Sequence, residues 1–261
     1  MKGSNKNICV AGVLGVIFVL MIYYAYADAT DPTGPQSITR DEDQRFDVSS
    51  WPSLEVGAEA GNVTKLTITS LTQTQAWQGY YGEISGTITL DDAHNYTMYD
   101  WALADPEGEI YASNGSSVTW SSIMCVNYSN DISSDFALNL TTLEDMFGMA
   151  ESDVDGIDET FNESGHLSDG TTDHPVVYVG THTIAAGTCP ATDLYENDSS
   201  SGINFTEILL TDNSSIIFTS IIEVNRMGYN SSTWDFQMLV GEDGHDGDDT
   251  VTPYYFFVEL E

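Results

Sequence analysis

The segment EISGTITL, residues 83–90, decides the fold class that the sequence predicts. Alternate positions are apolar, so one face of an extended strand carries Ile84, Ile88 and Leu90, while the opposite face carries Ser85, Thr87 and Thr89 after Glu83. This alternation is typical of a strand with one buried face and one exposed face. We therefore expect Ile88 and Leu90 to lie in the core of a β domain.

Similar short runs recur along the chain, separated by Gly, Asn and Asp. They cover residues 63–71, 96–104, 109–113, 117–120, 123–127, 176–185, 205–210, 216–224, 234–240 and 254–260. About a dozen strands at this spacing predict an all-β fold, namely a β-sandwich of the immunoglobulin-like or jelly-roll-like kind. One short helix is expected at 143–150, after the capping pair of Thr142 and Asp145.

The first 27 residues have the layout of an export signal. Lys2 and Lys6 precede a hydrophobic helix of 17 uncharged residues, Ile8–Tyr24, and small residues follow at 25–29. This length fits either a signal peptide or an N-terminal transmembrane anchor, and a pilin-type leader is a third reading. In each case the basic end stays inside, so the rest of the chain is expected outside the cell, with membrane contact through this segment only.

Two further parts are expected beyond the export segment. Residues 28–55 are rich in Pro, Gly, Ser and charge, which is typical of a linker. Residues 56–261 contain the predicted strands and form the ectodomain. The location expected for this ectodomain is the extracellular face of the membrane or the medium.

Sequons for N-glycosylation are unusually dense. Of the 12 Asn from residue 28 onward, 10 begin an N-x-Ser/Thr triplet, whereas the 52 Ser and Thr among these 234 residues would give roughly 3 by chance. The predicted acceptors are Asn62, Asn95, Asn114, Asn127, Asn139, Asn162, Asn197, Asn204, Asn213 and Asn230. The alternative is that Ser/Thr-rich turns produce such triplets by themselves.

The cysteines agree with export. Cys9 lies in the apolar run, which leaves Cys125 and Cys189 as the only pair in the exported part. In an oxidising compartment we expect them to form a disulfide, and the alternative is two separate buried thiols.

The charge balance excludes one class of partner. The chain has 41 Asp and Glu against 6 Lys and Arg, a formal charge of −35. A nucleic-acid binder needs clustered Lys and Arg, so nucleic acid is not an expected partner. Such a surface resists aggregation at high salt, as in salt-adapted archaeal proteomes, or binds divalent cations between neighbouring subunits.

One acidic loop has the spacing of a cation site. Asp153, Asp155 and Asp158 flank Gly156, and short loops of this kind wrap Ca²⁺ with carboxylate oxygens. The alternative is a solvated acidic loop. A second acidic loop at 242–249 has the same two readings. No other cofactor is expected.

The remaining motifs favour a role other than catalysis. No nucleophile elbow, Walker loop or H-E-x-x-H motif occurs, and Asp173-His174 with one of many Ser would fit almost any Ser-rich chain. The aromatic cluster of Trp77, Tyr80 and Tyr81, continued by Tyr99, Trp101 and Trp120, suits either a core or a carbohydrate platform, and core is the favoured reading.

Two segments carry a resemblance to a known group. The stretch WQGYYGEISGTITLDDAHNYTMYDW, residues 77–101, and the closing TPYYFFVELE, residues 252–261, resemble uncharacterised archaeal secreted and cell-surface β-sandwich glycoproteins. The resemblance covers most of residues 60–261 and implies a location and a lineage rather than an activity.

Together these observations predict an exported, N-glycosylated protein of an archaeal cell envelope with a structural or interaction role, as part of a surface coat, a filament or an adhesion apparatus. The expected partners are other envelope proteins or like subunits. The alternatives are a binding module for carbohydrate or for a Ca²⁺-dependent ligand, with glycans as partners, and a secreted hydrolase with unmarked carboxylates.

Overall fold

The computed structural model describes residues 30–41, 43–46, 51–127, 140–150, 152–162, 164–167, 170–200, 204–243 and 251–260. Three predictions lie outside these residues: the export segment 1–27, the sequon at Asn139 and most of the acidic loop 242–249. Within the described ranges, no helix is both long enough and apolar enough to span a bilayer.

The described part consists mainly of β-strands, which confirms the all-β class. The strands are β1 (Trp77–Gly82), β2 (Gly86–Asp91), β3 (Thr97–Leu103), β4 (Gly108–Ser113), β5 (Met124–Cys125), β6 (Val177–Val179), β7 (His182–Ile184), β8 (Ala191–Asp193), β9 (Thr206–Thr211), β10 (Ile216–Ile221), β11 (Arg226–Met227), β12 (Thr233–Trp234), β13 (Phe236–Gly241) and β14 (Tyr255–Leu260). The helical segments are η2 (Trp120–Ser122), α2 (Leu140–Met146) and α3 (Ile157–Thr160).

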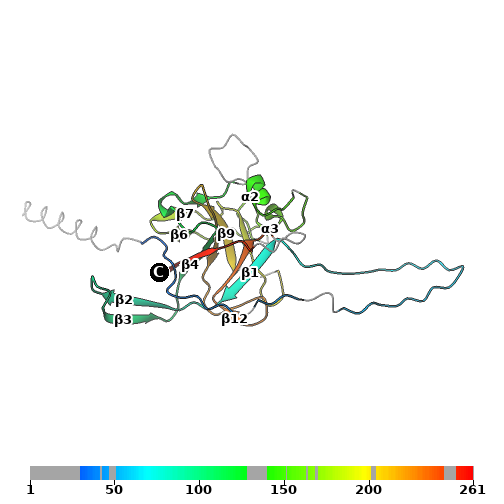
Figure 1. The fold of residues 1–261 in the computed structure, drawn as a ribbon, viewed down its shortest axis with the longest axis horizontal. Helices are drawn as coiled ribbons and strands as arrows, with labels where there is room; N and C mark the ends of the chain where they lie inside the picture. Colours follow the sequence, from blue (N-terminus) through cyan, green and yellow to red (C-terminus); the bar gives the residue numbers. More distant parts are fainter. Residues whose placement is uncertain are drawn as a thin grey trace, which may run out of the picture.

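A six-stranded antiparallel sheet forms the centre of the molecule (Figure 1). Its order is β14-β4-β10-β9-β5, and β8 shares the outer edge of β9 with β5. The turn between β9 and β10 is fixed by Asp212, whose carboxylate accepts the backbone N–H groups of Ser214 and Ser215. Asn213 adopts a positive φ of 74° in this turn, a conformation that Asn tolerates better than most residues.

Both faces of the central sheet are covered. Leu209 and Phe218 lie opposite each other on one face, and Leu210 and Ile217 lie opposite each other on the other face. All four are fully buried, in two separate clusters of core residues. Strands buried on both sides carry nearly continuous apolar runs, which explains why β9 and β10 do not alternate between apolar and polar residues.

The first face is covered by the β1–β13 pair together with α2 and α3. Met238 of β13, Phe147 just after α2 and Ile157 of α3 all join the core on this side. The predicted helix at 143–150 is therefore confirmed in kind, but it begins at Leu140 and ends at Met146. The sequence predicts one short helix, whereas the structure contains a second, α3.

The second face is covered by the β6–β7 hairpin and the loop that leads into β8. Val177, Val179 and Ile184 pack here with Cys189. Cys125 and Cys189 form a disulfide, as predicted. The bond joins β5 to the loop before β8, so it links segments separated by 64 residues on the same side of the sheet.

The prediction for residues 83–90 is wrong in one respect. The segment does form a strand, β2, which pairs with β3. This hairpin projects away from the body of the molecule (Figure 1), so Ile88 and Leu90 are 53% and 51% exposed instead of buried. The alternation is real, but none of the described elements covers the apolar face that it creates.

The predicted strand at 63–71 is also wrong, because this segment is extended and forms no strand. It belongs to an arm, defined here as residues 51–75, that projects from the side of the body opposite the β2–β3 hairpin (Figure 1). A strand needs a neighbour for its backbone hydrogen bonds, and no other described segment provides one for residues 63–71.

Part of the predicted linker packs on the domain. Thr33 exchanges two backbone hydrogen bonds with Val258 of β14, at N···O distances of 3.1 and 2.8 Å. The neighbouring Pro32 is buried. Residues 31–33 therefore cover part of the outer edge of β14, which would otherwise present unpaired backbone groups to solvent.

Candidate functional site

The β2–β3 hairpin is amphipathic, and its apolar face is open to solvent. The register places Ile88 opposite Trp101 and Leu90 opposite Tyr99, so these four side chains lie on one face. Each is at least 50% exposed. The rings of Tyr99 and Trp101 contact each other with centroids 4.8 Å apart. The other face is more polar and carries Thr87, Thr89 and Asp100 together with Ala102 and Met98, so burying the apolar face against a partner would leave the more polar face in water.

The root of this hairpin is held firmly to the domain. The carboxylate of Asp235 accepts the backbone N–H of Ile84 at 2.8 Å and that of Asn225 at 2.8 Å. A Cβ at Gly86 would lie 2.5 Å from Leu260 Cδ1, so glycine at this position leaves room for the side chain of Leu260 at the end of β14. The hairpin is thus presented on a fixed base.

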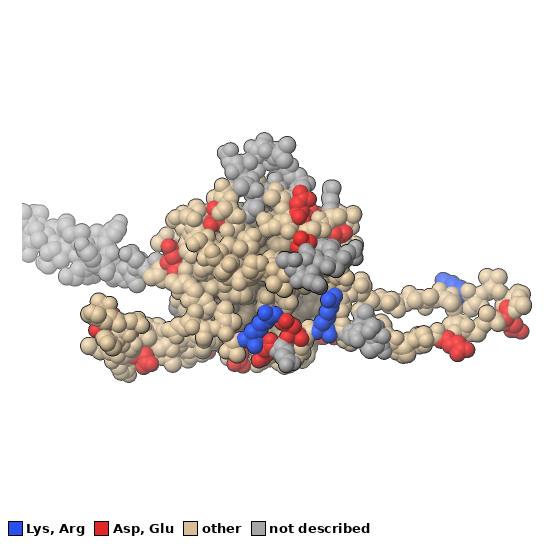
Figure 2. Space-filling view, viewed as in Figure 1, with Lys and Arg blue, Asp and Glu red and all other residues tan. Residues whose placement is uncertain are grey.

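The arm exposes a second set of apolar side chains. Its members are Trp51, Leu54, Val56, Val63, Leu66, Ile68 and Leu71, each at least 48% exposed. Near the base of the arm, Arg45 Nε donates to Gln73 Oε1 at 3.1 Å and so ties the end of the arm to the segment that precedes it. The hairpin and the arm carry few charged groups on the face that Figure 2 shows. Exposed apolar segments of this size mark interaction sites in soluble proteins.

A cluster of three carboxylates lies where α2 meets α3. Glu144 comes from α2, and Asp158 and Glu159 come from α3. One carboxylate oxygen of each lies within 4.8 Å of the other two. Burial first, and then the neighbouring Asp158 and Glu159, raises the pKa of Glu144 to about 7. The neighbouring Asp158 carboxylate is also the main cause that raises the pKa of Glu159.

The structure separates the three residues of the predicted calcium loop. Asp158 is part of the carboxylate cluster, but Asp153 accepts the backbone N–H of Ala150 at 2.7 Å. Asp155 faces β1: its carboxylate accepts the hydroxyl of Thr74 at 2.6 Å, and its carbonyl accepts Trp77 Nε1–H at 2.7 Å. The carboxylate cluster therefore consists of Asp158 with Glu144 and Glu159, and the sequence spacing did not predict the last two.

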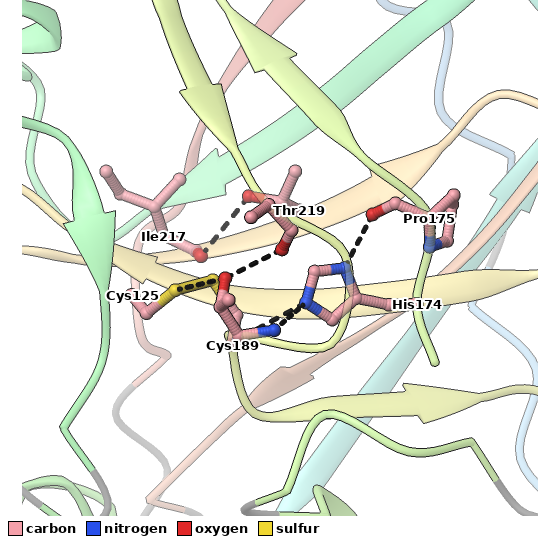
Figure 3. The surroundings of a disulfide bond; sticks show 8 residues. Cys125, His174, Pro175, Cys189, Ile217 and Thr219 are labelled. Atoms are coloured by element: carbon pink, nitrogen blue, oxygen red, sulfur yellow. Dashed lines mark hydrogen bonds between the residues drawn. A yellow bond between two sulfur atoms is a disulfide. The ribbon is translucent and has the colours of Figure 1, made fainter. Parts of the chain in front are cut away.

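His174 lies beside the disulfide and uses both ring nitrogens (Figure 3). Its Nδ1 is 2.7 Å from the carbonyl oxygen of Pro175, and its Nε2 accepts the backbone N–H groups of Thr188 and Cys189, both at 3.0 Å. This pattern requires a neutral ring with the proton on Nδ1. Burial lowers the pKa of His174 and so favours the same form. The Asp173-His174 pair considered for catalysis thus has no free base nitrogen, because His174 organises the disulfide loop.

Replacing His174 with Ala is expected to lower the free energy of unfolding by about 2 kcal/mol at pH 8, since the buried N–H of Cys189 and the partly buried N–H of Thr188 lose their acceptor. This difference in unfolding free energy between wild type and variant should become smaller as the pH falls from 7.5 to 5.5. In that range unfolded His174 takes up a proton and the folded residue resists it, so the wild type loses stability that the variant does not have. Denaturant unfolding at each pH measures both effects. His182→Ala, at a half-exposed position on β7, is the control, and a gap that is constant with pH would contradict the assignment.

The aromatic cluster is divided between core and surface. Trp120 is buried, and Trp77 and Tyr80 pack against the first core, as the favoured reading predicts. Tyr81, Tyr99 and Trp101 are exposed, so the core reading is wrong for these three. Tyr81 contacts Tyr229 and Trp234, with ring centroids 5.1 and 4.8 Å apart.

None of the nine described sequon asparagines is buried. Asn62 lies near the tip of the arm and Asn95 at the tip of the hairpin, and both are exposed. Asn95, Asn197 and Asn213 have positive φ values, so these three also serve as turn residues. The amide nitrogen of Asn204 donates to both carboxylate oxygens of Glu196, which makes it the acceptor least available for a glycan.

The chain was compared with known protein families, curated proteins and solved structures. None of the three comparisons finds a match.

Proposed function

We propose that this chain is an exported, N-glycosylated, non-enzymatic protein of an archaeal cell envelope, with a structural role in contact with like subunits. The observation that carries the proposal is the β2–β3 hairpin, whose apolar face has no partner among the residues that the structure describes. A two-stranded hairpin is only marginally stable alone in water. Covering Ile88, Leu90, Tyr99 and Trp101 would remove this apolar surface from solvent.

The arm of a second copy is the partner that fits this face best. Residues 63–71 have the composition of a strand and unpaired backbone groups, so they can pair with another chain. Lys65 is the only cation on the arm, which also carries Glu55 and Glu59, whereas the hairpin carries Asp91, Asp92 and Asp100 and no cation. The two surfaces therefore match in their apolar side chains, and Lys65 offers one cation to the acidic hairpin. Since they lie on opposite sides of the body, such contacts would repeat head to tail and build a filament or a coat.

Three observations support export and glycosylation. The described sequon asparagines are all outside the core, the exported part contains a disulfide, and the acidic surface suits a salty medium. In this proposal the export segment directs the domain to the outer face of the membrane, or anchors it there. Neighbouring subunits then contact one another through the hairpin and the arm.

The proposal also includes the finer fold class, a β-sandwich. The β1–β13 pair would form the second, smaller sheet over the central one. Support comes from Met238 and Val240 of β13, which share a core with Leu209 and Phe218 of the central sheet.

Self-association of the purified full chain tests the proposal, by sedimentation in detergent and 1 M KCl. We expect concentration-dependent oligomers for the wild type. Tyr99→Ser/Trp101→Ser should weaken association at least tenfold, about 1.4 kcal/mol, and Leu66→Ser/Ile68→Ser in the arm should have the same effect. The matched control is Tyr195→Ser, which removes an exposed tyrosine from the body.

A mixture of the two defective variants sharpens this test. Each variant keeps one intact surface, so the mixture should form dimers but no longer chains, whereas each variant alone stays monomeric. A wild type that remains monomeric up to about 100 μM would overturn the proposal of like subunits. Crosslinks in cells from the hairpin to a different envelope protein would overturn it as well.

Carbohydrate binding is the second candidate function, and one observation favours it. Tyr81, Tyr229 and Trp234 form an aromatic cluster on the surface, with Tyr81 and Tyr229 more than 40% exposed. Aromatic rings of this kind suit the apolar faces of sugars. Glycan binding that is lost on Tyr81→Ala but kept on Trp101→Ser would assign the function to this cluster instead of the hairpin.

A further inference from the structure

The carboxylate cluster of Glu144, Asp158 and Glu159 lies on two short helices, α2 and α3, that are packed into the core. Leu143, next to Glu144, is fully buried in the first core. Ile157, next to Asp158, and Phe161, two residues beyond Glu159, are fully buried in the same core. The backbone positions from which the three carboxylates extend are therefore fixed relative to one another.

Three carboxylate oxygens converge on one point of this cluster. A Cβ placed on Gly156 would lie 2.6 Å from Glu159 Oε2, 3.2 Å from Asp158 Oδ1 and 3.2 Å from Glu144 Oε1. The ligand atoms of the three side chains also lie within 4.8 Å of one another. Two oxygens on opposite sides of a Ca²⁺ ion, each about 2.4 Å from it, are about 4.8 Å apart. The spread of the cluster thus fits a single cation.

Glu144 provides an independent sign that a ligand belongs here. Its residue is only 5% exposed, and its Oε1 atom is buried without a hydrogen-bond partner. Burying a carboxylate oxygen without a donor is costly. The same atom lies close to the carboxylates of Asp158 and Glu159, which add negative charge around it. No ion pair between described residues reaches the cluster.

We propose that Glu144, Asp158 and Glu159 bind one Ca²⁺ ion at the junction of α2 and α3. The donors are hard carboxylate oxygens without His or Cys, which excludes a preference for zinc or copper. Asp158 and Glu159 are exposed, so water can complete the six to eight ligands that Ca²⁺ takes. Mg²⁺ demands a stricter octahedral geometry and releases its water reluctantly, so it should bind more weakly.

The site is coupled to the base of the arm. The loop that leads into α3 includes Asp155, which holds Thr74 and Trp77 by hydrogen bonds of 2.6 and 2.7 Å. A cation that fixes α3 would therefore fix the attachment of the arm as well. The cation site itself does not depend on the proposed assembly.

Calcium titration of the purified full chain tests the site, in detergent and 1 M KCl after removal of metals with EDTA. High salt screens diffuse binding to the acidic surface. We expect one saturable site with a dissociation constant of about 0.1–1 mM, as in extracellular calcium modules, and a rise in Tm of about 5 °C at 10 mM Ca²⁺. Mg²⁺ at the same concentration should raise the Tm less.

The variant Glu144→Gln tests whether Glu144 is a Ca²⁺ ligand or an acid that does not contact the ion. This variant should bind Ca²⁺ at least tenfold more weakly, yet in EDTA it should have a higher Tm than the wild type, because it removes one of three clustered negative charges. At 10 mM Ca²⁺ the order should reverse. Glu59→Gln on the arm removes the same charge outside the cluster and should leave both results unchanged. No saturable binding by the wild type, or equal affinity of wild type and Glu144→Gln, would overturn the site.

Discussion

The variant Cys125→Ala/Cys189→Ala is expected to lose about 4 kcal/mol of unfolding free energy relative to the oxidised wild type. The disulfide closes a loop of 64 residues, and in the chain-entropy model such a crosslink removes conformations from the unfolded chain by about this amount. The loop it closes contains α2, α3 and the β6–β7 hairpin, which cover both faces of the central sheet. Chemical denaturation at constant salt measures the loss as a fall in the midpoint.

Reduction of the wild type separates the crosslink from the packing of the side chains. Cys189 is fully buried, so the Ala variant also loses the contacts of its sulfur. The reduced wild type keeps those atoms and should account for most of the loss. Cys125→Ala alone frees Cys189 as a thiol and should resemble the reduced protein. A midpoint that does not respond to reduction would show that the bond adds nothing to stability.

The disulfide was predictable because the alternatives were few. Beyond the apolar run at residues 8–24, which contains Cys9, the chain has only Cys125 and Cys189, so oxidation among them allows one pairing. The strands β9, β10 and β14 were predictable for a similar reason, since long β-branched and aromatic runs have few other conformations available. The helix at α2 followed from the spacing of Leu143 and Phe147, although its ends were displaced.

The projecting segments were not predictable, because alternation in a sequence does not say what covers the apolar face. Residues 86–91 and 63–71 have the same pattern as a half-buried strand. In the structure the first segment pairs only with its neighbour, and the second pairs with no described segment. Both errors have one physical cause: strand composition predicts a partner, and that partner need not be in the same chain.

The carboxylate cluster could not be predicted from the sequence, for a different reason. Glu144 is separated from Asp158 by a loop, and in a chain with 41 acids nothing marks these residues as neighbours. The spacing of Asp153, Asp155 and Asp158 drew attention to the correct region, but the local hydrogen bonds of Asp153 and Asp155 direct them elsewhere. One usable signal was the position of Glu144 beside a core-facing leucine, which places it near the buried side of an amphipathic helix.

Glu207→Gln should stabilise the protein at neutral and alkaline pH, by an amount on the order of 2 kcal/mol at pH 8. Glu207 lies on β9 and is fully buried, on the same face of the sheet as Leu209. One carboxylate oxygen accepts the backbone N–H of Leu239 at 2.8 Å, and the other has no hydrogen-bond partner. Burial raises the pKa of Glu207 well above its ordinary value, so the folded protein holds this carboxyl in the protonated, neutral form.

The stabilisation by Glu207→Gln is expected to increase with pH. Below about pH 4, Glu207 is protonated in both the folded and the unfolded chain, and Gln has nearly the same shape, so wild type and variant should be equally stable. As the pH rises above the ordinary pKa of a glutamate, the unfolded chain releases the proton and the folded chain keeps it, so the wild type loses stability progressively. The variant has no such proton. The difference between the two unfolding free energies, measured by denaturant titration from pH 4 to pH 8, should therefore grow with pH.

The comparison isolates Glu207 because every other titrating group is common to both proteins, including Glu144, whose raised pKa of about 7 acts in the same direction. Glu83→Gln, at an exposed position, removes the same charge from the surface and controls for the change in net charge. A difference that stays constant with pH would show that folded Glu207 is ionised, and so that a cation or a water network reaches it from outside the core. A difference that grows with pH would establish that the chain maintains a neutral acid at the centre of its sheet, despite an overall formal charge of −35.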